Sequence, residues 1–350
     1  MREAKSAASG HPVIVGMIGL AAAALLRLLG TRLPGMPDSA ARILCIAGGV
    51  AGAAAVILLL RTALRYAARR LRTKPSALLL KCVVLLAAVV TFAALIFLII
   101  YILIHGVPNL KPSLFAWEYN SENVSLLPAL INTLMMTVLA LLIAAPLGIF
   151  TAIYLVEYAG RGNKLVEVIR VTAETLSGIP SIVYGLFGML FFVTFCRWRL
   201  SLLAGACTVA IMILPFIIRT TEEALIAVPD TYREASYGIG AGRLRTVFKV
   251  VLPSALPGIL AGIILAVGRI VGETAALIYT AGTLPQIASG ANFLFDSTRT
   301  LAVHMYLLSS EGFHTEEAYA TAVVLLVMVL AINGLSNLIA SRLSKGKCEE

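Results

Sequence analysis

The stretch TEEALIAVPDTYREASYGIGAGRLRTVFKVVLPSAL occupies residues 221–256 and decides how this chain is interpreted. It lies in a segment, 220–256, that is too polar to cross a membrane. Apolar runs at 202–219 and 257–280 flank it, and a membrane-spanning helix needs about 20 such residues. The pattern therefore predicts two membrane spans joined by a loop that has structure of its own.

Turn and cap residues divide this loop into two helices. Asp230 or Thr231 can cap a first helix that begins near Tyr232. Three glycines, Gly238, Gly240 and Gly242, interrupt it, and Gly240 permits a sharp reversal of the chain. A second, amphipathic helix is predicted from about Arg243 and is expected to end before Pro253.

The composition of the whole chain is that of a membrane protein. Of its 350 residues, 59% are hydrophobic and 13% charged, and the mean hydropathy is +0.93. Soluble domains are roughly 45–50% apolar and about 25% charged, so lipid must solvate much of this surface. The net charge of +10 fits the excess of Lys and Arg in cytoplasmic loops. Nucleic acid is not expected as a partner, because the basic residues lie beside apolar spans.

The apolar runs predict an all-α polytopic fold. Six clear spans follow residue 80, at 82–104, 129–156, 176–196, 202–219, 257–280 and 319–340. Two weaker ones, at 12–29 and 43–60, lie in an N-terminal extension, 1–75, which precedes a transmembrane domain at 76–345. The first could instead be a signal peptide, but no A-x-A-like cleavage site follows it. The total of six or eight spans stays open.

Basic residues set the predicted orientation. The segment 61–81 carries seven Lys and Arg residues and no acid, which places it in the cytoplasm. Counting spans from there puts both termini in the cytoplasm, together with 158–175 and 220–256. The loops 105–128 and 281–318 are then external, and the second is expected to contain a short helix near Leu301–Leu308.

The quoted stretch resembles the E-A-A, three residues, G, nine residues, I-x-L-P pattern of ABC importer permeases. The matching positions are Glu234, Ala235, Ser236, Gly240, Leu252 and Pro253. Ser236 replaces an Ala and Val250 replaces the Ile, and both keep the size class. The resemblance implies that these residues couple the chain to an ATPase, whereas the alternative is an ordinary helical hairpin.

Four further stretches resemble the PstA-type phosphate permease family: 146–160, 177–188, 214–225 and 268–282. The resemblance covers about residues 82–341. It implies a type I ABC importer core of six helices in the bacterial cytoplasmic (inner) membrane, which translocates phosphate by alternating access. It also implies a PstC-like second permease, a PstB-like ATPase dimer that binds ATP and Mg²⁺, and an external PstS-like phosphate-binding protein.

Other transport functions remain as alternatives. One is an ABC permease for another oxyanion, such as molybdate or sulfate, and a more distant one is an ion-coupled secondary transporter. The sequence has no G-x-x-x-x-G-K-[ST] loop, so no ATPase site is expected in this chain. No catalytic residue, metal site or cofactor of its own is expected either.

Two charged residues in the 257–280 span are the main candidates for the substrate pathway. A charge at the bilayer centre costs at least about 2.5–3.5 kcal/mol, so it normally faces a cavity or a partner. Arg269 and Glu273 are four residues apart and would share one helix face. A guanidinium suits a phosphate oxyanion, and Glu273 would orient it. The alternative is a structural ion pair.

Further pathway candidates lie in two other spans. Pro180 interrupts the 176–196 span and frees a backbone carbonyl, and Ser181 is placed to help satisfy it. Arg219 ends the 202–219 span, where it either reaches the interface or forms an exit for the anion. Weaker candidates are Asn132 and Thr133. The four histidines show no ligand spacing and are expected to be solvated.

Overall fold

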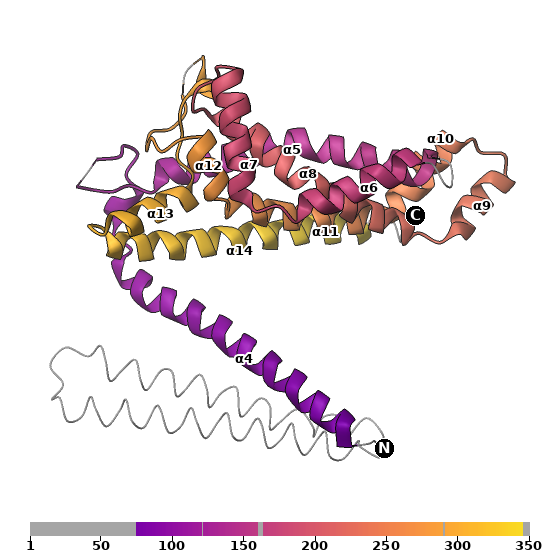
Figure 1. Cartoon of the computed structure of the whole chain (residues 1–350), viewed down its shortest axis with the longest axis horizontal. Coiled ribbons are helices and arrows are strands. Elements are labelled where there is room, and N and C mark those ends of the chain that lie inside the picture. Colours follow the sequence, from indigo (N-terminus) through magenta and orange to yellow (C-terminus); the bar gives the residue numbers. More distant parts are fainter. Residues whose placement is uncertain (1–74, 121, 160–163, 290, 346–350) are drawn as a thin grey trace. The chain divides into compact units, whose positions relative to one another are not determined.

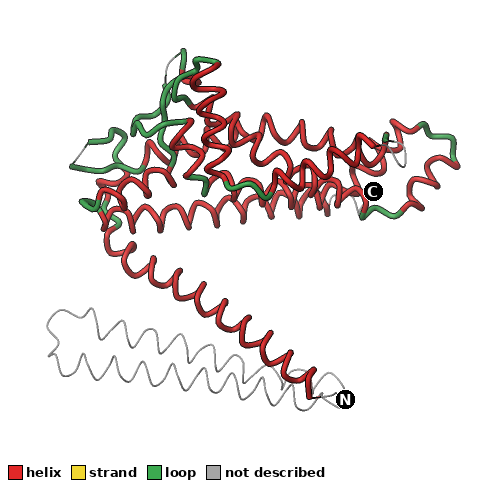
Figure 2. The backbone as a smooth tube through the Cα atoms, in the orientation of Figure 1, coloured by secondary structure: helices red, strands yellow, loops and turns green. Residues whose placement is uncertain are grey.

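The computed structural model describes residues 75–120, 122–159, 164–289 and 291–345. The chain divides into two compact units, 1–98 and 99–350. The spans expected at 12–29 and 43–60 lie outside the described residues. In the described part every regular element is helical, and no strand occurs, as Figure 2 shows. This confirms the predicted all-α class.

The first long helix is α4 (Pro75–Gly106), which begins in the first unit. Its side chains from Leu80 to Leu98 are almost all exposed, although nearly all are apolar. Lipid is the solvent that such a surface requires. The span predicted at 82–104 is therefore confirmed.

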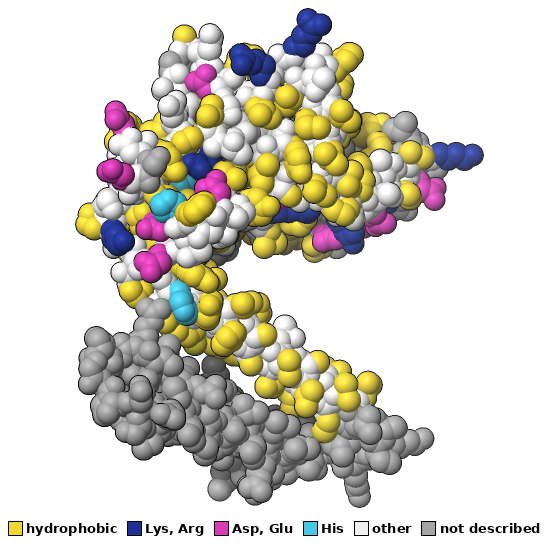
Figure 3. All heavy atoms as spheres, turned by 60° about the vertical axis from the view of Figure 1, so that its left-hand side comes forward, with side chains coloured by type: hydrophobic (Ala, Val, Ile, Leu, Met, Phe, Trp, Pro, Cys, Tyr) yellow, Lys and Arg dark blue, Asp and Glu magenta, His cyan; other side chains and the backbone are white. Residues whose placement is uncertain are grey.

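In the second unit four long helices run alongside one another (Figure 1). They are α5 (Leu127–Ile153), α8 (Leu202–Ile226), α11 (Leu252–Val271) and α14 (Thr315–Lys345). In the described residues five helices are long and apolar enough to cross a membrane, or six if one bent pair counts as a span. The spans predicted at 129–156 and 319–340 are confirmed. Figure 3 shows hydrophobic side chains over much of the described surface.

Shorter elements complete the described part of this unit. They are η1 (Val107–Asn109), η2 (Pro112–Phe115), η3 (Tyr154–Tyr158), α6 (Lys164–Ser177), α7 (Ser181–Gly188), η4 (Met189–Phe195), α9 (Asp230–Gly238), α10 (Arg243–Thr246), η5 (Val247–Val251), α12 (Ala275–Thr280), η6 (Phe293–Phe295) and α13 (Leu301–Glu311). α13 confirms the short helix expected in the 281–318 loop. Charged side chains gather at that end of the unit (Figure 3).

The span predicted at 176–196 is not one straight helix. α6 occupies most of the predicted loop 158–175, and it meets α7 and η4 at an angle of 102°. Residues 178–180 separate the two helices. Pro180 has no N–H and its ring disfavours a helical conformation in the preceding residue, so the chain turns at this point.

The span predicted at 257–280 differs at both of its ends. Helical structure runs from Arg243 to Val271 without a break, so the expectation that the helix ends before Pro253 is wrong. The π-helical turn η5 ends at Val251, two residues before Pro253. Extra backbone of this kind accommodates a proline ring that would clash with an earlier carbonyl. At the other end, residues 272–274 separate α11 from α12.

Candidate functional site

The break between α6 and α7 frees the carbonyl of Leu176, because Pro180 cannot donate to it. The hydroxyl of Tyr184 donates to this oxygen at 2.8 Å, and the Ile179 N–H does so at 3.1 Å. Ser181 is the half-buried first residue of α7 and makes no side-chain hydrogen bond within the described structure. The free carbonyl is therefore satisfied by Tyr184 and not, as the sequence had predicted, by Ser181.

The break between α11 and α12 changes the interpretation of Glu273. α11 ends at Val271, so the expectation that Arg269 and Glu273 share a helix face is wrong. The Glu273 side chain is buried, and its Oε1 accepts a hydrogen bond from the Ala276 N–H at 3.0 Å. A carboxylate there satisfies a free donor and lies at the positive end of the helix dipole. Thr274 is the N-cap residue of α12 and makes no side-chain cap bond, so the Glu273 side chain, one residue earlier, caps the first turn of α12 in its place.

The Arg269 guanidinium lies beside this break. It is exposed, and it forms no ion pair with any described residue. The two breaks are neighbours, because a Cβ on Gly185 of α7 would lie 2.8 Å from the Cα of Ala276 in α12. The fold therefore places an available cation where two interrupted helices meet.

Arg219 has partners, unlike Arg269. Its guanidinium lies 3.2 Å from Glu223 on α8 and 3.8 Å from Glu174 on α6. All three side chains are more than half exposed, and such pairs contribute about 0–1 kcal/mol each. Arg219 therefore links two helices, and its predicted role as an exit for anions stays a prediction.

The weaker candidates on α5 hold neighbouring loops in place. Asn132 is fully buried and donates to the carbonyl of Gln286 at 2.8 Å. Thr133 is buried as well, and its hydroxyl accepts from the Leu301 N–H at 2.8 Å. Both side chains satisfy buried backbone groups, which gives them a structural role.

His304 on α13 is fully buried, so the expectation that the four histidines are solvated is wrong here. Neither ring nitrogen has a hydrogen-bond partner in the described structure. Burial, and secondarily the charge of Arg299, lowers the pKa of His304 to about 3. The Arg299 guanidinium lies 4.9 Å from the ring centre of Tyr119, and the Tyr119 and His304 ring centres are 6.1 Å apart.

The 220–256 segment forms the predicted hairpin with small changes. α9 begins at Asp230, after Pro229 as its N-cap, and the second helix begins at Arg243 as predicted. Gly240 has φ +83°, a conformation that favours glycine. The reversal expected at Gly240 is confirmed. Leu252 and Pro253 are half-buried in the first turn of α11.

The first three positions of the motif divide between two environments. Glu234 and Ala235 are exposed, whereas Ser236 is buried. The hydroxyls of Ser236 and Thr246 lie 2.9 Å apart and form a hydrogen bond between α9 and α10. The replacement of Ala by Ser at position 236 therefore adds a bond that fixes the hairpin.

The hairpin presents large apolar side chains to its surroundings. Those more than 40% exposed are Tyr232, Tyr237, Ile239, Leu244 and Phe248. These side chains lie on both sides of Glu234 in the sequence, within a segment that is otherwise polar. Exposed apolar patches of this kind mark surfaces that bind another protein.

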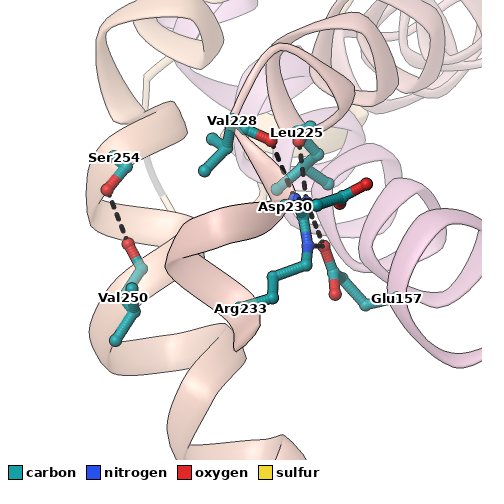
Figure 4. A network of polar contacts seen from close by, with 7 residues as sticks. All are labelled: Glu157, Leu225, Val228, Asp230, Arg233, Val250 and Ser254. Carbon is teal, nitrogen blue, oxygen red and sulfur yellow. Dashed lines mark hydrogen bonds and ion pairs between the residues drawn. The ribbon is translucent and has the colours of Figure 1, made fainter. Parts of the chain in front are cut away.

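Arg233 connects α9 to the rest of the unit (Figure 4). Its Nη2 and Nε atoms lie 2.7 and 3.1 Å from Oε1 of Glu157, which is part of η3. The hydrogen bonds that Arg233 donates to Glu157 raise the pKa of the guanidinium above its ordinary value. Its other donors reach the carbonyls of Val228 and Leu225 and the carboxylate of Asp230. The pairing of Arg233 with Glu157 could not be predicted from the sequence, because the two residues lie 76 positions apart in it.

A family model described as "Binding-protein-dependent transport system inner membrane component" matches residues 144–346. Among curated proteins, the probable ABC transporter permease protein YqgI of Bacillus subtilis is 36% identical over 262 residues, covering 69% of this chain and 87% of its own length. Phosphate transport system permease protein PstA 1 of Mycobacterium tuberculosis is 35% identical over 205 residues, covering 59% of this chain and 67% of its own length.

Two solved structures support the fold. The MetNI methionine ABC transporter in an inward-facing conformation matches with a TM-score of 0.50 and 22% identity, covering 62% of this chain and 93% of that one. A bacterial alginate ABC transporter in complex with its periplasmic protein matches with a TM-score of 0.51 and 17% identity, covering 73% and 95%.

Proposed function

The chain belongs to the inner-membrane components of binding-protein-dependent transport systems, and on that basis we propose that it is the phosphate permease subunit of an ATP-driven importer. The main structural support for a partner ATPase is the exposed apolar surface of α9 and α10. The hairpin lies beyond the ends of the long helices (Figure 1), and large apolar side chains there require a protein partner. A secondary transporter would not need this surface.

Phosphate is the substrate that the relatives and the site favour together. Curated relatives about one-third identical are named phosphate permeases. Arg269 supplies a guanidinium that no described residue neutralises, and its planar donors suit a phosphate oxyanion. A single cation would give a transient contact, so tight selection would fall to the external binding protein.

Alternating access would use partners that this chain lacks. A PstB-like ATPase dimer would hold ATP and Mg²⁺ and close against α9. A PstC-like permease would complete the membrane pathway, and a PstS-like protein would deliver phosphate from outside. The α9 end of the chain would then face the cytoplasm, together with both termini.

The pathway residues have unequal support in this scheme. Arg269 would contact phosphate directly. Glu273 would act through the cap that it forms on α12, while Ser181 and Arg219 remain predicted pathway residues. The coupling residues Glu234 and Ala235 lie on the surface that would face the ATPase.

Phosphate uptake by the complete importer in proteoliposomes tests this proposal. We expect uptake that requires ATP, and a loss of at least tenfold in an Arg269→Ala variant that retains its partners. Arg170→Gln is the matched control, because it removes a cation outside the proposed pathway that pairs with Glu222, and it should keep most of the uptake. Equal competition by sulfate or molybdate would indicate another oxyanion. Uptake without ATP would contradict the proposal.

A further inference from the structure

Arg233 lies where three parts of the fold meet. It projects from α9 toward η3, which continues α5, and toward the last turn of α8 and the residues after it (Figure 4). Within the described residues, every side-chain hydrogen bond and ion pair from α9 to η3 or α8 involves Arg233. A displacement of α9 would therefore act on two membrane helices through this side chain.

The guanidinium uses its full set of donors. It has five N–H groups. Nε and Nη2 each donate to Glu157, Nη1 donates to Val228 and Asp230, and Nη2 also donates to Leu225. The Leu225 carbonyl lies in the last turn of α8 and that of Val228 lies two residues after the helix, where the negative end of the helix dipole attracts cations. Lysine has three donors without a planar arrangement and cannot reproduce this set.

Burial makes the connection stiff. The side chain of Glu157 is 4% exposed and that of Arg233 is 14% exposed. Water screens a buried pair of this kind far less than a surface pair, and removal of one partner leaves the other charge buried without compensation. The docking surface on the hairpin is separate from this pair, because Glu234, Tyr237 and Ile239 point outward and are exposed.

We propose that the Arg233–Glu157 pair is the joint that transmits movement of α9 to α5 and α8 during transport. Arg233 is a positioning residue in this scheme and touches neither ATP nor substrate. The inference rests on the proposed function as an ATP-driven importer. It predicts that breaking the joint separates ATP hydrolysis from uptake while the subunits stay assembled.

The test uses the complete importer in proteoliposomes with its binding protein, and measures ATP hydrolysis and phosphate uptake on one preparation. For Arg233→Lys and Glu157→Gln we expect at least a tenfold fall in phosphate imported per ATP hydrolysed. Hydrolysis should stay within about twofold, and the ATPase should still co-purify. Asp230→Asn is the matched control, because it removes the charge of an 81% exposed partner of the same guanidinium and should leave the ratio unchanged.

A purely structural role would give a different result. Hydrolysis and uptake would then fall in parallel, or the ATPase would no longer co-purify, and either outcome would overturn the proposal. If Glu157→Gln fails to accumulate, Arg233→Lys alone decides, because it keeps a cation beside Glu157. An unchanged ratio in Arg233→Lys would equally refute the joint.

Failure of the proposed substrate can be recognised separately. If the wild-type importer hydrolyses ATP but imports no phosphate, the substrate assignment fails. The joint is then decided by the stimulation of hydrolysis by the binding protein, which should be lost in Arg233→Lys and kept in Asp230→Asn. Retained stimulation in Arg233→Lys would overturn the joint.

Discussion

Replacing Glu273 by Gln and by Ala distinguishes a helix cap from a charge that acts on the substrate. The Glu273 Oε1 atom accepts from the Ala276 N–H at 3.0 Å, and a Gln amide oxygen can accept the same bond. Alanine cannot. If Glu273 is a cap, Glu273→Gln should retain most of the phosphate uptake and Glu273→Ala should lose most of it.

The magnitudes follow from the two contributions of this carboxylate. Loss of a cap costs about 0.5–2 kcal/mol. A charge at a partly buried helix N-terminus contributes up to about 2 kcal/mol. Glu273→Gln removes only the second contribution, so we expect it to lower the free energy of unfolding by about 1 kcal/mol. Glu273→Ala removes both, and we expect a decrease of about 2–3 kcal/mol.

The assay pairs thermal unfolding of the purified chain in detergent with uptake by the reconstituted importer. Glu223→Gln is the control, because it removes an exposed carboxylate that pairs with Arg219 and should cost under about 1 kcal/mol. If Glu273→Gln abolishes uptake as fully as Glu273→Ala while its unfolding midpoint stays near wild type, the carboxylate charge acts in the pathway and the cap argument is refuted.

Three further predictions concern packing, pH and the α6–α7 break. A Cβ on Gly188 would lie 2.2 Å from Oγ1 of Thr208, so Gly188→Ala should destabilise the chain by about 1–3 kcal/mol, and adding Thr208→Ala should restore part of the unfolding midpoint. His304, whose pKa falls from 6.5 to about 3, is neutral when folded but binds a proton when unfolded below pH 6.5; stability should therefore fall toward acid pH by at most about 1.4 kcal/mol per pH unit, and pH-dependent unfolding of His304→Leu should show a shallower fall. Tyr184→Phe removes the hydrogen bond to the Leu176 carbonyl and should lower the free energy of unfolding by about 1 kcal/mol, measured by thermal unfolding in detergent.

Each of these predictions has an outcome that contradicts it. Gly334 has open space around it, so Gly334→Ala is the control for Gly188→Ala, and equal effects of the two would refute the packing argument. An unchanged pH profile in His304→Leu would show that another group titrates. A Tyr184→Phe variant as stable as wild type would show that the Ile179 N–H alone satisfies the Leu176 carbonyl.

The sequence was sufficient for features that depend on local composition and spacing. Apolar runs of membrane length predicted α4, α5 and α14, because lipid requires about 20 apolar residues whatever the neighbouring helices do. The glycine at position 240 predicted the reversal after α9, because a left-handed conformation is a property of one residue. The candidate site was predicted in part: Arg269 was identified as an intramembrane charge, but its surroundings were not.

Contacts between distant segments decided the rest. The sequence alone determined an α-helical membrane protein with a structured polar hairpin and an arginine inside a membrane span, since hydropathy and turn residues act locally. Only the tertiary structure showed that Glu273 caps α12, that Tyr184 satisfies the Leu176 carbonyl, and that Arg233 binds Glu157. A side chain's partner depends on which segments pack together in space, and local patterns in a single sequence do not determine that packing.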